Sequence, residues 1–313
     1  MPELSVGDRH WSVEPGCNLL DALLEAGQSV AHSCRAGSCG ACRVRCLYGE
    51  PLDARPDALP ASERAAGWRL ACQCRVSEDL GVELFDPAQQ TLAAEVVGHD
   101  WLAPEVLRLR LAAEVPLRYQ AGQHLLLWRD HSLARPYSLA SLPGEDAFLE
   151  FHIDCAGRGG FCDYARRLRP GDPLRLSGLQ GGALRYEPEW QERPLWLLAT
   201  GTGLAPLWAI LREALRQGHA GPIHLLHLAR SSTEHYLADA LDGLAQRHTN
   251  LQVTLLEHSQ AGAWLQAQRP SRDTRVLLCG APARVDALAR ALYLAGLPRG
   301  QLYREPYITA AGA

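Results

Sequence analysis

Residues 34–42 read Cys-Arg-Ala-Gly-Ser-Cys-Gly-Ala-Cys, and residues 70–73 read Leu-Ala-Cys-Gln. Seven of the ten cysteines in this 313-residue chain lie within its first 74 residues. Residues 1–11 carry acids rather than the basic and then apolar pattern of a secretion signal. Thiols in such a chain are more often metal ligands than disulfides. The clustering therefore predicts a separate metal-binding unit.

The spacing Cys34-x4-Cys39-x2-Cys42, with Cys72 further along the chain, is that of a plant-type 2Fe-2S site. Small residues between the first three thiols let the backbone approach a cluster and let its amides donate to sulfur. The alternative is a structural zinc held by Cys39, Cys42, Cys72 and Cys74. That alternative leaves Cys34 without a role.

The pattern alone does not choose the fourth cluster ligand. If residues 69–76 form one extended strand, Cys72 and Cys74 point to the same face, because side chains two apart in a strand share a face. Both thiols are then candidates.

The chain divides into three units by its pattern of apolar residues and turns. Asn18 is expected to cap a helix over residues 19–24, so that residues 1–87 form a compact α+β unit. Residues 92–192 show short alternating stretches between Pro and Gly turns, which predicts an antiparallel β-barrel. Residues 193–313 alternate strand and helix, which predicts a doubly wound parallel α/β sheet.

The second unit contains Arg135-Pro136-Tyr137-Ser138 at the end of an expected strand. The guanidinium can bind a diphosphate in bidentate fashion, the tyrosine ring can stack on an isoalloxazine, and the hydroxyl can hydrogen-bond the flavin edge. Taken alone, the four residues fit an ordinary turn equally well.

Two glycine-rich loops are candidates for binding a pyrophosphate. Residues 157–162 lead into a helix expected over 163–168, and residues 201–206 follow a strand and open a helix. A tight βα turn is the plain alternative for the second loop. Cys279-Gly280 ends a later strand at the same carboxyl edge of the sheet, where ligands of open α/β folds bind.

Taken together and in this order, the motifs resemble those of the flavin reductases of multicomponent oxygenases, such as the reductases that serve benzoate and related aromatic-ring dioxygenases. The first unit resembles a plant-type ferredoxin, and the rest is similar to the ferredoxin-NADP reductase family. The resemblance implies a 2Fe-2S cluster, FAD and a nicotinamide nucleotide. It also implies that the cluster ligands are Cys34, Cys39, Cys42 and Cys72, because the family's ligand lies in a Leu-Ala-Cys-Gln context.

The same resemblance assigns roles to residues of the last two units. It implies that Ser138, Cys279 and Glu305 are the catalytic residues beside the nicotinamide. The cofactor-binding residues that it implies are Arg135, Pro136, Tyr137, Ser138, His152, Ile153, Gly160, Phe161, Cys162, Thr200, Gly201, Thr202, Gly203, Pro206, Arg230, Cys279, Gly280 and Tyr307. Cys162 departs from the family, which usually has a serine or threonine there.

The implied function is an enzyme that passes electrons from NADH through FAD and the cluster to an acceptor protein, such as a Rieske or other oxygenase component. NADH is expected rather than NADPH, although Arg230 could tolerate a 2'-phosphate and no acid stands beside it in the sequence. The alternatives from other classes are a redox-sensing or nucleotide-sensing module on a reductase scaffold and a zinc-stabilised adaptor.

Charge and hydropathy limit the binding partners and the cellular location that we expect for this protein. A net charge of −4 argues against nucleic-acid binding, and no apolar run approaches the roughly 18 residues of a membrane helix. A cytoplasmic protein is expected. Residues 1–86 carry a net charge of −5, yet Arg35, Arg43 and Arg45 flank the cysteine loop, so acidic groups are expected on the acceptor.

Overall fold

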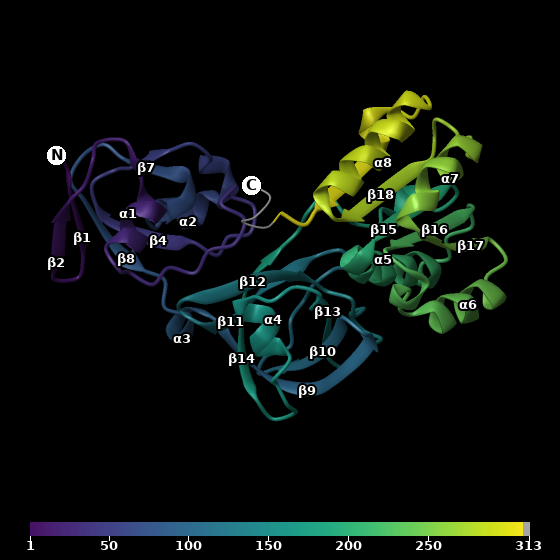
Figure 1. The fold of residues 1–313 in the computed structure, drawn as a ribbon, viewed down its shortest axis with the longest axis horizontal. Helices are drawn as coiled ribbons and strands as arrows, with labels where there is room; N and C mark the ends of the chain where they lie inside the picture. Colours follow the sequence, from purple (N-terminus) through teal and green to yellow (C-terminus); the bar gives the residue numbers. More distant parts are fainter. Residues whose placement is uncertain (309–313) are drawn as a thin grey trace.

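The computed structural model describes residues 1–308, which form three units in chain order (Figure 1). The N-terminal unit and the C-terminal unit lie at opposite ends of the molecule, and the barrel unit lies between them. No helix within the described residues is long and apolar enough to cross a membrane. The observed layers match the predicted multidomain fold class.

The N-terminal unit is a five-stranded sheet with one main helix packed on it. The strand order is β2-β1-β8-β4-β6, with β1 Glu3–Val6, β2 Arg9–Ser12, β4 Arg43–Tyr48, β6 Trp68–Leu70 and β8 Leu80–Leu84. Helix α1 spans Leu19–Glu25 and is capped by the Asn18 side chain, which accepts hydrogen bonds from the amides of residues 20 and 21. A small second sheet has β3 Cys17–Asn18, β5 Leu52–Asp53 and β7 Cys74–Val76, and α2 spans Ala61–Ala65.

The expected strand over residues 69–76 is interrupted in the structure. A 3-10 turn over Ala71–Gln73 separates β6 from β7. The premise that Cys72 and Cys74 share one strand face is therefore wrong, because the turn rotates the chain between them. The polar segment after this unit forms a short helix, α3 Pro87–Gln90, capped by Asp86.

The barrel unit contains six antiparallel strands in the order β12-β11-β14-β9-β10-β13. Their bounds are β9 Leu92–Ala103, β10 Val106–Ala113, β11 His124–Asp130, β12 Leu133–Ser138, β13 Leu149–Asp154 and β14 Pro173–Gln180. A bridge between Leu139 and Phe151 joins the two edges, so the sheet closes on itself. Helix α4 spans Gly160–Ala165, three residues earlier than the helix expected over 163–168.

The C-terminal unit is a parallel five-stranded sheet in the order β17-β16-β15-β18-β19. Its strands are β15 Leu195–Thr200, β16 Ile223–Ala229, β17 Leu251–Glu257, β18 Arg275–Gly280 and β19 Leu302–Pro306. Its helices are α5 Leu204–Arg216, α6 Ala238–Arg247, α7 Ala261–Ala267 and α8 Pro282–Leu294. Alternate residues of the buried strand β15 pack into two different apolar clusters, one on each face of the sheet. This is the predicted doubly wound architecture.

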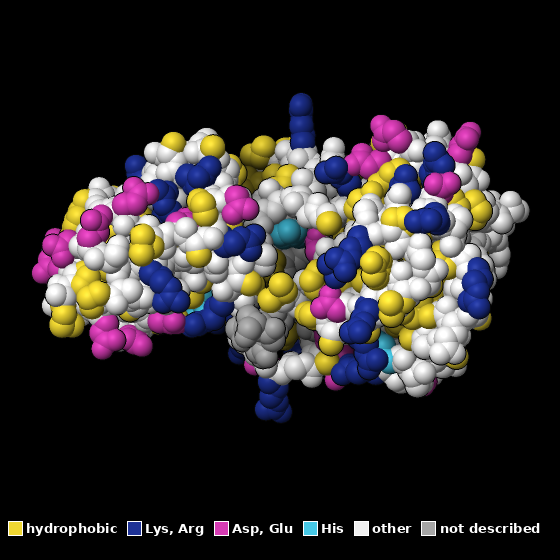
Figure 2. Space-filling view, turned by 90° about the horizontal axis from the view of Figure 1, so that it is seen from above, with side chains coloured by type: hydrophobic (Ala, Val, Ile, Leu, Met, Phe, Trp, Pro, Cys, Tyr) yellow, Lys and Arg dark blue, Asp and Glu magenta, His cyan; other side chains and the backbone are white. Residues whose placement is uncertain are grey.

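The N-terminal and barrel units share an apolar cluster. Cys34 and Cys39 of the cysteine loop pack with Leu126, Trp128 and Ala134 of the barrel. On the other side of the barrel, the Arg212 guanidinium of α5 lies 2.7 Å from the Asp146 carboxylate. Figure 2 shows acidic side chains gathered toward the outer end of the N-terminal unit, away from the barrel. The cysteine loop is therefore turned inward, toward the rest of the chain.

Candidate functional site

The four predicted cluster ligands come together as two pairs of thiols. Cys34 is hydrogen-bonded to Cys39, and Cys42 is hydrogen-bonded to Cys72. Within residues 1–308 no group of three or more His, Cys, Asp or Glu side chains is arranged to hold one metal ion. Two pairs fit a binuclear cluster, in which each iron takes two thiolates.

Backbone and side-chain donors surround these sulfurs. The amides of Ala36 and Cys39 donate to Cys34 Sγ at 3.3 and 3.4 Å. The hydrogen bond from the Cys39 thiol is the largest cause that lowers the pKa of Cys34, to about 4, against the opposing effect of burial. Gln73 Nε2 donates to Cys72 Sγ at 3.3 Å. Donors to sulfur stabilise thiolates, which are the form that binds iron.

Cys74 has a different environment. It is completely buried in the apolar core of the N-terminal unit, and burial raises its pKa. Cys17 and Cys46 are partly exposed and pack against the same core. Of Cys72 and Cys74, only Cys72 is hydrogen-bonded to another predicted cluster ligand, Cys42.

Strand β12 carries the predicted flavin motif between the two neighbouring units. Arg135 Nη1 donates to the carbonyl of His32 in the N-terminal unit at 2.8 Å. The Tyr137 ring packs on Phe161 at 5.2 Å between centroids. Ser138 Oγ lies 3.2 Å from the hydroxyl of Tyr307, close to the end of the C-terminal unit. One strand thus contacts both units within four residues.

The two predicted flavin-binding residues on β13, His152 and Ile153, are buried. Ile153 is completely buried in the barrel core. His152 Nε2 lies 3.0 Å from Glu150 Oε1, and its ring packs against Tyr236. Burial lowers the pKa of His152, so its ring is neutral and donates to Glu150. Neither side chain projects from the barrel surface as a free ligand-binding group.

The first glycine loop ends on a pair of thiols. Gly160 contacts Leu133, and Phe161 is buried beneath Tyr137. Cys162, at the position where a hydroxyl was expected, donates to the carbonyl of Asp154 at 3.2 Å. It is also hydrogen-bonded to Cys155, which is completely buried.

The second glycine loop is held against the strand that carries Cys279. An added Cβ on Gly203 would overlap the carbonyl of Cys279, and one on Gly280, where φ is +126°, would overlap Thr200. Thr200 Oγ1 accepts from the amide of residue 281 at 2.9 Å. The predicted residues Gly201, Thr202 and Pro206 lie on the same turn and the first turn of α5. These residues form one edge at the carboxyl ends of β15 and β18.

The three predicted catalytic residues are brought together around Tyr307. Its hydroxyl contacts Ser138 and donates to the carbonyl of Thr202 at 3.3 Å, and it is hydrogen-bonded to the thiol of Cys279. Glu305 pairs with Cys279 in the register of β18 and β19. Burial raises the pKa of Glu305 to about 7.

Arg230 is held by two acids, which corrects the expectation that no acid stands beside it. It lies 2.7 Å from Glu105 of the barrel and 2.9 Å from Glu234. The chain folds back four residues after Arg230, which brings Glu234 beside it. Sequence order alone did not reveal Glu105, which is 125 residues away.

The arginines beside the cysteine loop are also paired. Arg35 lies 2.7 Å from Asp21, and Arg43 lies 2.6 Å from Glu63. Arg45 lies 3.7 Å from Glu83. The local charge is close to balanced, so the expectation of an acidic acceptor loses its physical basis.

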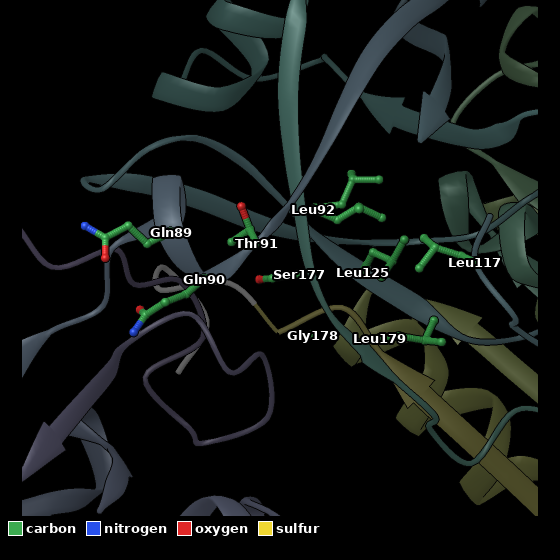
Figure 3. Close-up of a pocket in the computed structure, with 10 residues that line it drawn as sticks. Gln89, Gln90, Thr91, Leu92, Leu117, Leu125, Ser177, Gly178 and Leu179 are labelled. Carbon is green, nitrogen blue, oxygen red and sulfur yellow. The ribbon is translucent and has the colours of Figure 1, made fainter. Parts of the chain in front are cut away.

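Two hollows lie near the site, and neither is lined by the three predicted catalytic residues. One, of about 410 Å³, is lined by Arg158, Asp163, Arg166 and Arg167 beside the first glycine loop. The other, of about 450 Å³, lies where residues 89–92 meet the barrel, and leucines 117, 125 and 179 line its apolar side (Figure 3). Ser138, Cys279 and Glu305 are instead packed together with Tyr307.

Several residues at the site were not identified from the sequence. His124 Nδ1 lies 3.8 Å from Glu305, and its Nε2 lies 3.2 Å from Gln180 Oε1. The Gln180 side chain in turn lies against Gly40 of the cysteine loop. His227 donates from Nε2 to the carbonyl of Gly201 at 3.1 Å. Gln73 alone had a sequence signal, because it completes the Leu-Ala-Cys-Gln motif.

Comparisons with known proteins agree with this three-part site. The chain matches the family models of the 2Fe-2S iron-sulfur cluster binding domain over residues 6–77, the oxidoreductase FAD-binding domain over 93–186 and the oxidoreductase NAD-binding domain over 197–290. The match to a 2Fe-2S domain decides against the zinc alternative.

Relatives match along almost the whole chain. The reductase component of the naphthalene 1,2-dioxygenase/salicylate 5-hydroxylase systems of Ralstonia is 31% identical, with 95% of each chain covered. The reductase subunit of an aromatic O-demethylase of Amycolatopsis is 31% identical, with 98% of this chain and 99% of the relative covered.

Two solved structures also match this chain along almost its whole length. A cytochrome P450 reductase of Amycolatopsis has a TM-score of 0.67 at 30% identity, covering 98% of this chain and 99% of that one. A ferredoxin reductase of carbazole 1,9a-dioxygenase, at 23% identity and a TM-score of 0.65, has the same fold over 98% of both chains. The chain belongs to the family of ferredoxin-NAD(P)+ reductase components of oxygenase systems, enzymes that pass electrons from a nicotinamide nucleotide through FAD and a 2Fe-2S cluster to a partner protein.

Proposed function

We propose that this protein takes electron pairs from NADH at the site formed by Ser138, Cys279 and Glu305, and delivers single electrons through the cluster loop to the metal centre of an oxygenase component. Strand β12 carries the argument. Its Arg135 contacts the cluster unit and its Ser138 contacts Tyr307 of the nucleotide unit. Three residue steps along a strand span about 10 Å, so the two redox sites are close.

The chain's own residues position the cofactors and exclude water. FAD, when bound, accepts two electrons together and releases them one at a time. Arg135 keeps guanidinium nitrogens available for the diphosphate while Nη1 holds the His32 carbonyl. The half-buried Tyr137 offers its ring for stacking, and Phe161 packs against it. Because these groups are packed before a ligand arrives, little ordering is needed on binding.

Glu305 and Tyr307 supply polar groups in buried surroundings. The pKa of Glu305 is raised to about 7 by burial, so its carboxyl can hold or release a proton near neutral pH. Burial lowers the pKa of the neighbouring His124, which stays neutral there. Tyr307 joins the barrel strand to the nucleotide loop through its two hydroxyl contacts.

The preference for NADH over NADPH is supported by the surroundings of Arg230. Glu105 and Glu234 already neutralise this guanidinium. A 2'-phosphate would have to displace these carboxylates or lie beside them, and like charges repel. A ribose hydroxyl could instead donate to either carboxylate.

The nucleotide preference is tested with Glu234→Gln. Removing one negative charge should raise kcat/KM for NADPH relative to NADH about tenfold, equivalent to about 1.4 kcal/mol. Initial rates with both nucleotides measure this ratio. Asp239→Asn, on the neighbouring helix α6, is the control for a general charge effect. A wild-type preference for NADPH contradicts the proposal.

We place the protein in the cytoplasm, where its ten free thiols would stay reduced. The acceptor proposed is a Rieske or other oxygenase component, since the named relatives serve a dioxygenase and hydroxylase system and an aromatic O-demethylase.

The electron route is tested by anaerobic mixing with NADH while flavin absorbance and the paramagnetic signal of the reduced cluster are followed. Flavin bleaching should come first and the cluster signal second. Bleaching without any cluster signal, in protein that contains the cluster, contradicts the proposed route.

A further inference from the structure

Two thiols outside the cluster face each other across the first glycine loop. Cys155 follows β13 and is completely buried, whereas Cys162, on α4, is partly exposed. Cys162 Sγ lies 3.2 Å from the carbonyl of Asp154, the residue directly before Cys155. The two thiols are also hydrogen-bonded to each other. The two thiols are therefore neighbours, and only the loop 156–161 separates them in sequence.

We propose that Cys155 and Cys162 form a modification site, at which a hydroperoxide closes a disulfide across the loop 156–161 and weakens the retention of FAD. The effect on FAD rests on the proposed function, because it requires this loop to hold the flavin diphosphate. Formation of the disulfide does not rest on the proposed function.

The surroundings assign different roles to the two thiols. The hydrogen bond from Cys155 lowers the pKa of Cys162 to about 7, so a large fraction is thiolate at neutral pH. The same hydrogen bond and burial raise the pKa of Cys155. Cys162 is therefore the attacking thiol and Cys155 the resolving one.

A small oxidant can reach Cys162 from solvent. The hollow lined by Arg158, Asp163, Arg166 and Arg167 borders the loop and the start of α4. The positive charge of Arg166 further favours the thiolate of Cys162. Hydrogen peroxide is small and neutral, so neither the hollow nor its charge excludes it.

The reaction balances with one peroxide. Cys162 thiolate attacks one peroxide oxygen, an S–O bond forms, the O–O bond breaks, and hydroxide leaves and takes up a proton. The Cys155 sulfur then attacks Cys162 sulfur, an S–S bond forms and the S–O bond breaks. The departing oxygen takes the Cys155 proton as water. Two thiols lose two electrons, and one hydrogen peroxide becomes two waters.

Closing the disulfide changes what the loop can offer a diphosphate. The bond ties the start of α4 to the end of β13, so the loop 156–161 can no longer adjust its backbone amides around a diphosphate. Loss of one such hydrogen bond corresponds to about tenfold weaker FAD binding.

The chain offers a direct test, because Arg158 lies between the two cysteines. The purified holoprotein is treated with excess hydrogen peroxide, alkylated under denaturing conditions and digested with trypsin without reduction. Trypsin does not cut before Pro136, so Cys155 falls in peptide 130–158 and Cys162 in peptide 159–166. Mass spectrometry should find these two peptides linked, and dithiothreitol should separate them.

The control Cys17→Ser should keep the linked peptide, whereas Cys155→Ser should lose it and should make FAD retention insensitive to peroxide. FAD affinity is measured by flavin fluorescence before and after treatment, and the loss should reverse with dithiothreitol. Separate, alkylated peptides after peroxide treatment overturn the proposal, as does a linked peptide with unchanged FAD affinity. Untreated protein that lacks FAD counts against the proposed function alone, since the peptide readout does not need flavin.

Discussion

Cys74 lies in an apolar core, whereas Cys72 lies on a turn beside Cys42 and accepts a hydrogen bond from Gln73. The two thiols are two residues apart and chemically identical, so their difference is one of surroundings. A cluster needs a thiolate with donors around its sulfur, and a buried thiol without donors stays protonated.

The first prediction compares Cys72→Ser with Cys74→Ser. Cys72→Ser should lose the cluster or alter its paramagnetic signal, because serine is a poorer ligand for iron than thiolate. Cys74→Ser should keep cluster content close to normal while lowering the melting temperature, since a hydroxyl replaces a packed sulfur. Iron, acid-labile sulfide and the signal of the reduced state measure both variants. The opposite pattern would show that Cys74 is the ligand.

The second prediction concerns Glu305 and pH. Its pKa is raised to about 7 in the folded protein by burial, so the folded state holds this proton more tightly than the unfolded state. The stabilisation is fully present below the unfolded pKa of about 4.3 and is lost as pH rises to about 7, which amounts to about 4 kcal/mol. The groups that face the carboxyl are His124, Cys279 and Tyr307.

Melting temperatures of wild type and Glu305→Gln between pH 5 and 8 measure this effect. The amide cannot ionise, so wild type should lose stability relative to the variant as pH rises from 5, and the difference should level off above about 7. A constant difference across this range would mean that Glu305 stays ionised.

At the level of elements, the turn between β15 and α5 depends on two glycines for different reasons. Gly201 has a φ of +53° with open space where a Cβ would lie. Gly203 has a helical φ of −58°, but a Cβ there would overlap the Cys279 carbonyl. The first glycine is needed for its backbone conformation, and the second for close contact between two strand ends.

The third prediction separates these roles. Gly203→Ala should push the loop away from β18 and raise KM for NADH markedly, because neither backbone can yield cheaply. Gly201→Ala should cost about 1 kcal/mol of stability from the positive φ while the loop keeps its place. KM and melting temperature are measured for both. Equal KM values for the two variants would contradict the close-contact argument.

At the level of the whole molecule, Trp128 links the cluster unit to the barrel. It packs with Cys34 and Cys39, stacks on Phe85 at 4.9 Å between centroids, and donates from Nε1 to Ser177 Oγ at 2.6 Å. Only 1% of its surface is exposed. Trp128 is therefore the largest side chain in the apolar contact between these two units.

The fourth prediction is that Trp128→Ala slows electron transfer from flavin to cluster while reduction of flavin by NADH continues at its normal rate. The lost packing should also cost about 3–5 kcal/mol of stability. Trp128→Phe keeps a smaller aromatic ring but loses the Nε1 donor, so it should transfer electrons much faster than Trp128→Ala. Stopped-flow absorbance at flavin and cluster wavelengths measures both steps. Equal slowing of both steps in Trp128→Ala would indicate general damage rather than a lost contact between units.

The sequence by itself determined the three-part architecture and the identity of the cluster loop, because both depend on local signals. Thiol spacing, the Asn18 cap and the alternation of strands and helices are each read within a few residues. The Arg135–Ser138 and 201–206 motifs were found in the same way. A local pattern suffices wherever the chemistry needs residues that are close in sequence.

Only the tertiary structure decided how these parts meet. The turn at Ala71–Gln73 separated Cys72 from Cys74, Glu105 came beside Arg230 from another unit, and Cys155 met Cys162. The same holds for His124 beside Glu305. Such contacts follow from how sheets close and units pack, which fix distances between residues far apart in the chain. No pattern within one segment carries that information, because each contact depends on the fold around both partners.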